Sequence, residues 1–281
     1  VFAKLFDGGD NWKQARLPQL HANPLLSALE CIAQQPCTVG MLAKVDHEKD
    51  NCVFCSTMWE ETGAQKDNVI LRNVHFPEYP DTLIYSGPHI GVANPLFKSS
   101  RHICKLNSDY DNIDLLRIDD RYLQRCNYVP VGRPSEYCHK IPKTPDGRYY
   151  TDDYRVVMRK MLNQSGERTL IAAIIPPRSK HINGIFGILI DDVLLLSAFM
   201  ASIPYDFLIK ASGKSNGGYD SVSAFPWITS GCYLPELRAR ALLLNAVNVY
   251  YADLVKKTFQ KSYNHCTWTK SDPRLSNDRF R

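Results

Sequence analysis

The sequence predicts an α+β fold: a β-rich middle, flanking helices and a long amphipathic helix near the C-terminus. Residues 171–175 are rich in β-branched isoleucine and run into Pro176 and Pro177, which is typical of a buried strand that ends at a double proline. Apolar residues recur at helical spacing over 23–33 and again from Leu237 to Val255. A composition with 44% hydrophobic and 22% charged residues is that of a folded globular chain.

The first helix is expected to start at Asn23, a capping residue, with Pro24 in its first turn. Residues 44–67 show no period and are expected to be irregular. Short strands are predicted at 69–74 and 82–85, and a turn-rich loop at 85–98, where glycine and proline alternate.

The middle of the chain, residues 122–154, is rich in Pro, Tyr, Arg and Lys and is expected to form a long surface excursion. A strand follows at 154–158, with Arg155 and Arg159 on the face opposite Val156 and Met158. Residues 181–190 are expected to pair with the strand at 171–175 or to lie next to it.

Asp191 and Asp192 are well placed to begin a helix that runs through Phe199 and ends at Pro204. A cationic loop is expected at 210–218. The apolar residues from Leu237 to Val255 predict one continuous helix of about six turns at 3.6 residues per turn.

Three segments follow from these patterns. They are a helical and irregular connecting segment at 1–66, a β-rich domain at 67–235, and a C-terminal helix and tail at 236–281. Because the sequence begins with Val1 in place of methionine, we expect a piece of a longer protein. The longest apolar run, 193–203, is too short to cross a bilayer, so we expect a soluble, cytoplasmic protein with no membrane partner.

Positive charge is concentrated in one part of the chain. Residues 121–180 hold twelve Lys and Arg against five Asp and Glu, an excess of seven, while the whole chain carries only +5. A local excess of this kind indicates a surface that binds a polyanion. The alternative is a solvated basic face without a ligand.

Metal and nucleotide motifs are incomplete. Cys52 and Cys55 have the spacing of half a zinc site, but no second pair exists, and nine scattered cysteines favour free thiols in a reducing compartment. We therefore predict no metal. The Gly-Lys-Ser run at 213–215 has Leu208 where a phosphate-binding loop requires glycine, so no nucleotide site is expected. No catalytic residue is assigned.

Several motifs, in the same order, resemble the specificity region of type IIG fused restriction–modification enzymes. They are LPQLHANPLLSAL at 17–29, YSGPHI at 85–90, NPLFK at 94–98, RTLIAAIIP at 168–176, SIPYDFLIK at 202–210, and LLLNAV with YADL at 242–254. The sequence departs from that family's pattern at Ala246, usually Cys, and Val255, usually Trp.

The resemblance implies a target recognition domain that binds double-stranded DNA and catalyses nothing itself. In that family an adenine-specific methyltransferase domain lies N-terminal to this region and uses S-adenosylmethionine, with or without an endonuclease activity. The chain itself is therefore expected to hold no cofactor, and the parent's methyltransferase domain is an expected partner.

The expected DNA contacts are cations for phosphates, with aromatic and amide groups for bases. Arg168 is a leading candidate because it stands at the mouth of a rigid strand. The full candidate set is Arg133, Lys140, Lys143, Arg148, Tyr149, Arg155, Arg159, Arg168, Lys180, Lys210, Lys214 and Asn216. Two alternatives remain: a docking module of the same enzyme that uses the helix from Leu237, and an independent nuclease or hydrolase.

Overall fold

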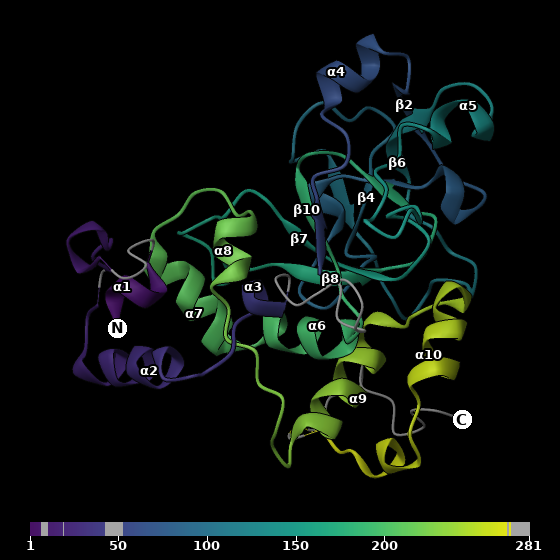
Figure 1. Ribbon diagram of the computed structural model, residues 1–281. Helices are drawn as coiled ribbons and strands as arrows, with labels where there is room; N and C mark the ends of the chain where they lie inside the picture. The colour runs from purple at the N-terminus through teal and green to yellow at the C-terminus, as the bar shows by residue number, and fades with distance from the viewer. Residues whose placement is uncertain (7–10, 19, 43–52, 269, 271–281) are drawn as a thin grey trace.

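The computed structural model describes residues 1–6, 11–18, 20–42, 53–268 and 270 (Figure 1). It has a mixed α and β architecture, with 35% helix and 19% strand, which confirms the predicted α+β class. Cys52 and the tail beyond residue 270 lie outside the described residues.

A four-stranded antiparallel sheet forms the centre of the molecule. Its order is β1 (Phe54–Ser56), β10 (Ile185–Leu189), β7 (Arg155–Arg159) and β8 (Ala172–Ile175). The strands predicted at 154–158 and 171–175 are confirmed to within one residue. The predicted pairing of 181–190 with 171–175 is wrong, because β7 lies between β10 and β8 and pairs with both.

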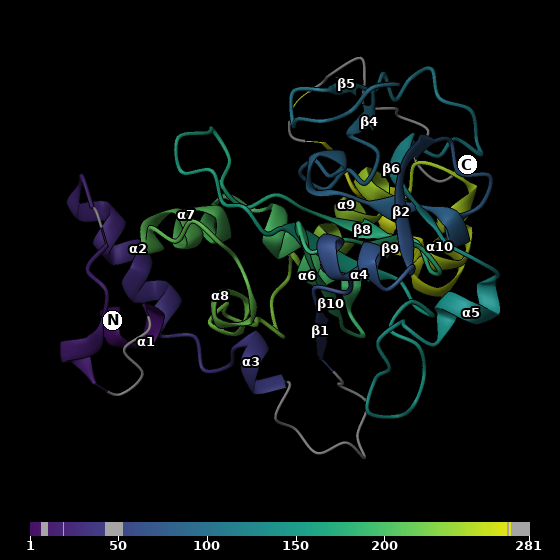
Figure 2. The ribbon, with the colours of Figure 1, turned by 90° about the horizontal axis from the view of Figure 1, so that it is seen from above.

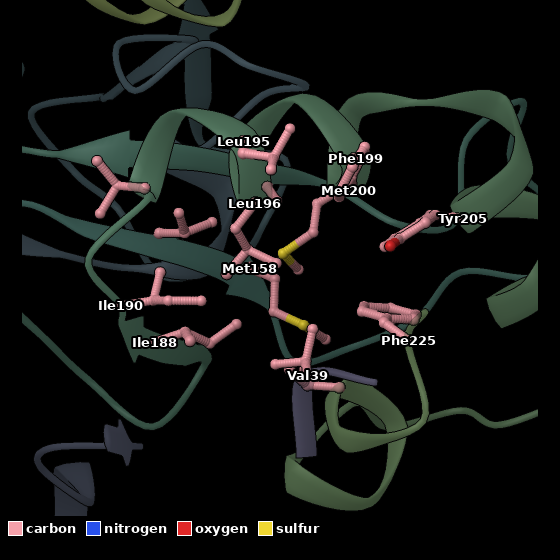
Figure 3. Close-up of a cluster of buried hydrophobic side chains, with 14 of the residues drawn as sticks. Val39, Met158, Ile188, Ile190, Leu195, Leu196, Phe199, Met200, Tyr205 and Phe225 are labelled. Atoms are coloured by element: carbon pink, nitrogen blue, oxygen red, sulfur yellow. The ribbon is translucent and has the colours of Figure 1, made fainter. Parts of the chain in front are cut away.

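Both faces of this sheet are covered, and β7 shows the alternation clearly. Val156 and Met158 face the largest hydrophobic cluster, where α6 (Val193–Ala201) packs on the sheet (Figure 3). Val157 belongs instead to a smaller cluster on the opposite face with Leu83 and Tyr85. Arg155 and Arg159 therefore share a face, as predicted, but that face is covered by the segment around 83–90.

The helices after the central sheet begin and end at capping residues. The side chain of Asp192 accepts a hydrogen bond from the backbone amide of Leu195 (3.0 Å) and begins α6. Ser202 ends α6 and caps α7 (Ile203–Ser212), so Pro204 lies in the first turn of a new helix. Gly213, with a φ of 65°, ends α7 in the left-handed region, before α8 (Tyr219–Ser223).

The N-terminal helices lie beside α7 (Figures 1 and 2). The predicted helix is present as α2 (Asn23–Ala33), although its N-cap is Ala22 and Asn23 is already helical. Leu5, Phe6 and Leu29 join the main hydrophobic cluster. The other elements here are α1 (Phe2–Leu5), η1 (Trp12–Gln14) and α3 (Val39–Leu42).

Three two-stranded sheets lie over the opposite face of the central sheet. They pair β2 (Ile70–His75) with β6 (Cys126–Pro130), β4 (Lys98–Ser100) with β5 (Tyr110–Asn112), and β3 (Ile84–Tyr85) with β9 (Lys180–His181). The short helices of this part are α4 (Glu61–Lys66), η2 (Pro80–Thr82), η3 (Gly87–His89) and α5 (Pro134–Cys138).

Two expectations for this part are wrong. The described portion of the segment predicted to be irregular contains β1 and α4. The predicted surface excursion at 122–154 contains β6 and α5, and its tyrosines at 128, 137, 150 and 154 are buried. Aromatic rings supply the apolar contact area that its few aliphatic residues cannot.

The prediction of one continuous C-terminal helix is also wrong. The chain there forms four elements: α9 (Leu234–Asn245), η4 (Val249–Tyr251), α10 (Ala252–Thr258) and η5 (Lys261–His265). At the break, the buried side chain of Asn245 accepts a hydrogen bond from the Ile174 amide (2.7 Å), and Asn248 caps the next turn. α9 packs on α6, and its buried residues join the main hydrophobic cluster (Figure 1).

The main hydrophobic cluster draws residues from all three predicted segments, including Leu5, Met158 and Tyr263. The segment boundaries themselves remain predictions. Among the described residues, no single helix has the length and apolar character needed to cross a membrane. Among these residues, only α6 and α7 counted together have that length and apolar character, and the two helices are bent by 65° relative to each other.

Candidate nucleic-acid interface

A cleft of about 760 Å³ opens where the small sheets meet the end of β7. Four basic side chains line it, and Glu61 is the acidic residue among its lining. The basic residues come from four different segments and are Arg72, Lys98, Lys105 and Arg159. The cleft therefore has the charge balance of an anion-binding surface.

The floor of the cleft is buried and polar. The amide of Asn127 accepts a hydrogen bond from the Ser100 hydroxyl and donates one to the Tyr110 hydroxyl (2.5 Å). Burial raises the pKa of Tyr110 to about 12, so its hydroxyl stays protonated. The Ser86 hydroxyl is also buried and interacts with the Tyr110 hydroxyl.

His89 supports this floor from beneath. Its Nδ1 accepts a hydrogen bond from the Ser86 amide (2.8 Å), and its Nε2 lies 3.1 Å from the Arg125 carbonyl oxygen. These two contacts require a neutral ring with the proton on Nε2. Burial lowers the pKa of His89 to about 4, in agreement with a neutral ring.

Arg159 links the cleft to the central sheet. Its Nε donates to the Ile90 carbonyl oxygen (2.8 Å), and its Nη2 donates to the same oxygen and to the Pro88 carbonyl oxygen (3.4 Å). The turn at 85–90 therefore holds the guanidinium in place. Among the described residues, none accepts a hydrogen bond from Nη1.

A second, more open depression of about 790 Å³ adjoins the cleft at Ser215, which lines both. Arg16, Lys214 and Asn216 line it, together with Asp220 and the glycines at 217 and 218. The two depressions thus share an edge, and the described residues that line them include six basic and two acidic ones.

Of the predicted site residues, Arg159 lines the cleft, and Lys214 and Asn216 line the adjoining depression. Arg133 is the N-cap of α5, Lys140, Lys143, Arg148 and Tyr149 follow that helix, and none of the five lines either depression. Arg148 forms ion pairs with Asp146 (2.7 Å) and with Asp153. The predicted set is therefore not brought together on one concave face.

The assignment of Arg155 to DNA contact needs correction. Its side chain is completely buried, and Nη2 donates to the carbonyl oxygens of Pro176 (3.1 Å) and Ser179 (2.8 Å). The guanidinium carbon lies 4.8 Å from the centre of the Tyr150 ring. Arg155 joins the end of β8 to the following turn, and in this conformation it cannot reach a phosphate.

Three further candidates form hydrogen bonds or ion pairs with other groups of the protein itself. Arg168 lies 3.4 Å from the Asp206 carboxylate and donates to the Ala201 carbonyl oxygen (2.9 Å). Lys180 is buried and donates to the Asp81 carbonyl oxygen, and burial lowers its pKa to about 8. Lys210 donates to the Gly166 carbonyl oxygen (2.8 Å). Their charges stabilise loops and helix ends.

Sequence reasoning missed most of the cleft, including Arg72, Lys98, Lys105 and Asn127. Arg72, Lys98 and Lys105 lie outside the basic stretch on which the prediction depended, and Asn127 lies within it but carries no charge. One signal was available, because Lys98 ends the NPLFK motif and residues 86–88 of the YSGPHI motif also line the cleft.

Within the described part of the chain, no group of three His, Cys, Asp or Glu side chains is arranged to hold a metal ion. Cys52 lies outside that part, and burial raises the pKa of Cys55 to about 12. Comparison of the chain with protein-family models gives no match, and comparison with curated proteins gives no significant match.

Proposed function

We propose that this chain is a sequence-specific DNA-binding domain, the target recognition part of a type IIG-like restriction–modification enzyme. The observation that carries the proposal is the convergence of four basic side chains on one cleft whose lining, among the described residues, contains one acidic side chain. Phosphate contacts dominate DNA affinity, and such a surface supplies them.

The motifs that carry the family resemblance support the same surface. Ser86, Gly87 and Pro88, from the first turn, and Lys98, from the second, line the cleft. Arg168 and Asp206, from two other motifs, meet in an ion pair that holds the adjacent strand and helix together. Four motifs thus contribute either to the cleft or to its support.

Base recognition is assigned to polar side chains at the cleft and the adjoining depression. Asn107 and Asn163 line the cleft and Asn216 lines the depression, and an asparagine amide can bond to an adenine edge in bidentate fashion. Arg72 and Arg159 are suited to guanine or to phosphate.

The chain is proposed to be non-catalytic. Methyl transfer from S-adenosylmethionine to adenine is assigned to a methyltransferase domain of the parent polypeptide, which is also the proposed protein partner. A cytoplasmic location is proposed because the target is DNA, and because the cysteines of the described residues are free thiols.

A docking module is the second candidate. Exposed apolar side chains between β4 and β5, such as Ile103 and Leu106, favour it. The helix originally expected to serve as its docking face is divided and packs on α6. If the chain is a docking module, it should not bind duplex DNA.

Fluorescence anisotropy on a labelled duplex, over a series of salt concentrations, tests the proposal. We expect log K to fall steeply with log salt, and each of Lys98→Ala and Lys105→Ala to make the slope shallower by about 0.9. Lys257→Ala, on the exposed side of α10, is the matched control and should leave the slope unchanged.

No binding at about 50 mM salt would reject a DNA-binding role. Equal slopes for the cleft variants and the control would reject this cleft as the DNA-facing surface.

A further inference from the structure

We infer that the cleft accepts a single unpaired nucleotide, with its base on the buried floor and its phosphates at the basic rim. This inference rests on the proposed DNA-binding function and adds the state of the DNA that the cleft binds. It depends on the contrast between the floor and the rim.

The floor has the chemistry of a base-binding surface. Tyr110 and Tyr128 line it with aromatic rings, and both are buried at 7% exposure. Base stacking on aromatic rings is a common source of affinity for unpaired nucleotides. Ile182 adds an apolar side chain to the same lining.

Hydrogen-bonding capacity on the floor is only partly used. Asn127 makes one bond through its oxygen and one through its nitrogen, which leaves a second lone pair and a second amide hydrogen. The Ser86 hydroxyl is buried in the same lining, and a hydroxyl has one hydrogen to donate and two lone pairs, so its contact with Tyr110 does not use all of its capacity. A base edge presents both donors and acceptors and could satisfy these groups.

The backbone keeps the floor open. Gly87 and Gly184 lie in the lining and face each other, and a Cβ added at Gly87 would lie 3.2 Å from the Gly184 carbonyl oxygen. A Cβ at Gly184 would come no closer than 3.6 Å to any neighbour, the Gly87 nitrogen. Gly184 therefore tolerates a side chain, which would occupy space in the cleft.

The rim differs sharply from the floor. Lys105 and Arg72 are exposed there, and two apolar side chains, Leu106 and Met161, are 68% and 69% exposed. Exposed apolar side chains next to cations are the kind that proteins insert between bases to unstack them. A paired duplex offers no base that can reach the buried floor, whereas an unpaired nucleotide can.

The test compares three DNA probes with the full chain: a fully paired duplex, the same duplex with one bulged adenosine, and the same duplex with a bulged abasic nucleotide. We expect the bulged adenosine to bind about tenfold more tightly than the paired duplex. The abasic bulge should bind like the paired duplex, because it lacks the base.

Gly184→Leu should remove the preference for the bulged adenosine and retain binding of the paired duplex. Ala252→Leu, on the exposed start of α10, is the control and should keep the preference. The three DNA probes are also compared with the unaltered protein, so the inference is tested even where Gly184→Leu fails to fold.

The outcomes separate the two proposals. Binding of the paired duplex with no preference for the bulged adenosine overturns this inference and leaves the DNA-binding function standing. Equal affinity for the base and abasic bulges, or a preference that persists in folded Gly184→Leu, also overturns it. No binding of any probe rejects the proposed function itself.

Discussion

Replacement of Asp206 by alanine should strongly destabilise the protein. Its carboxylate oxygen accepts hydrogen bonds from the backbone amides of Thr169 (2.8 Å) and Leu170 (2.6 Å) and lies 3.4 Å from Arg168 Nε. The Asp206 side chain is only 9% exposed, so water cannot replace these contacts.

The size of the effect follows from these contacts. Loss of a charged acceptor leaves two buried amides and one arginine without their partner, which costs about 4 kcal/mol of unfolding free energy. For a chain of this length that corresponds to a melting temperature lower by about 8 °C. Asp206→Asn retains one oxygen acceptor and should lose about half as much.

Urea denaturation followed by circular dichroism measures both variants, with an unchanged slope m as the sign that the unfolded state is the same. Asp253→Ala is the control, because that carboxylate is 74% exposed and its ion pair with Lys256 contributes under about 1 kcal/mol. A loss of less than about 1 kcal/mol in Asp206→Ala, or equal losses for alanine and asparagine, would refute the role given to this carboxylate.

Two further predictions concern the buried polar residues. Gly187→Ala should lower the unfolding free energy by about 3 kcal/mol, because the added Cβ would lie 1.7 Å from the Tyr150 hydroxyl. Tyr150→Phe removes that hydroxyl, so the double variant should recover part of the loss. If the losses of the two single variants simply add in the double variant, the steric explanation is contradicted. Burial lowers the pKa of His89 to about 4 and that of His181 to about 3, so the unfolded chain binds protons that the folded chain does not. The stability due to neutral histidines is complete above about pH 6.5 and should fall by about 1.4 kcal/mol per pH unit for each histidine as the pH drops toward 4. Urea titrations at a series of pH values measure this, and a stability independent of pH between 6.5 and 4.5 would show that the two rings are not buried in neutral form.

Local signals in the sequence predicted the central elements well. The double proline after β8, the capping aspartate before α6 and the alternation of Arg155 and Arg159 with Val156 on β7 all depend on neighbouring residues, and each is present. The long C-terminal helix failed because the break at Asn245 depends on a strand about seventy residues away. No local pattern contains that contact.

The predicted site shows the same limit. Charge counted along the chain cannot separate a cation that faces solvent from one that stabilises a loop, and Arg155, Arg168 and Lys180 are of the second kind. Charge reversal at Arg155 or Arg168 would therefore unfold the protein locally, whatever its ligand. The cleft joins segments from residue 61 to residue 215, which only the fold brings together.

The hydrophobic cluster around α6 contains Leu5 and Phe6 from the start of the chain and Tyr263 from near its end. During synthesis the ribosome exposes the first of these more than two hundred residues before the last. The core can close only when residue 263 has left the exit tunnel, and until then the β8 and α6 surfaces lack part of their covering. A nascent chain of this protein should therefore depend on chaperone protection until residue 263 has emerged.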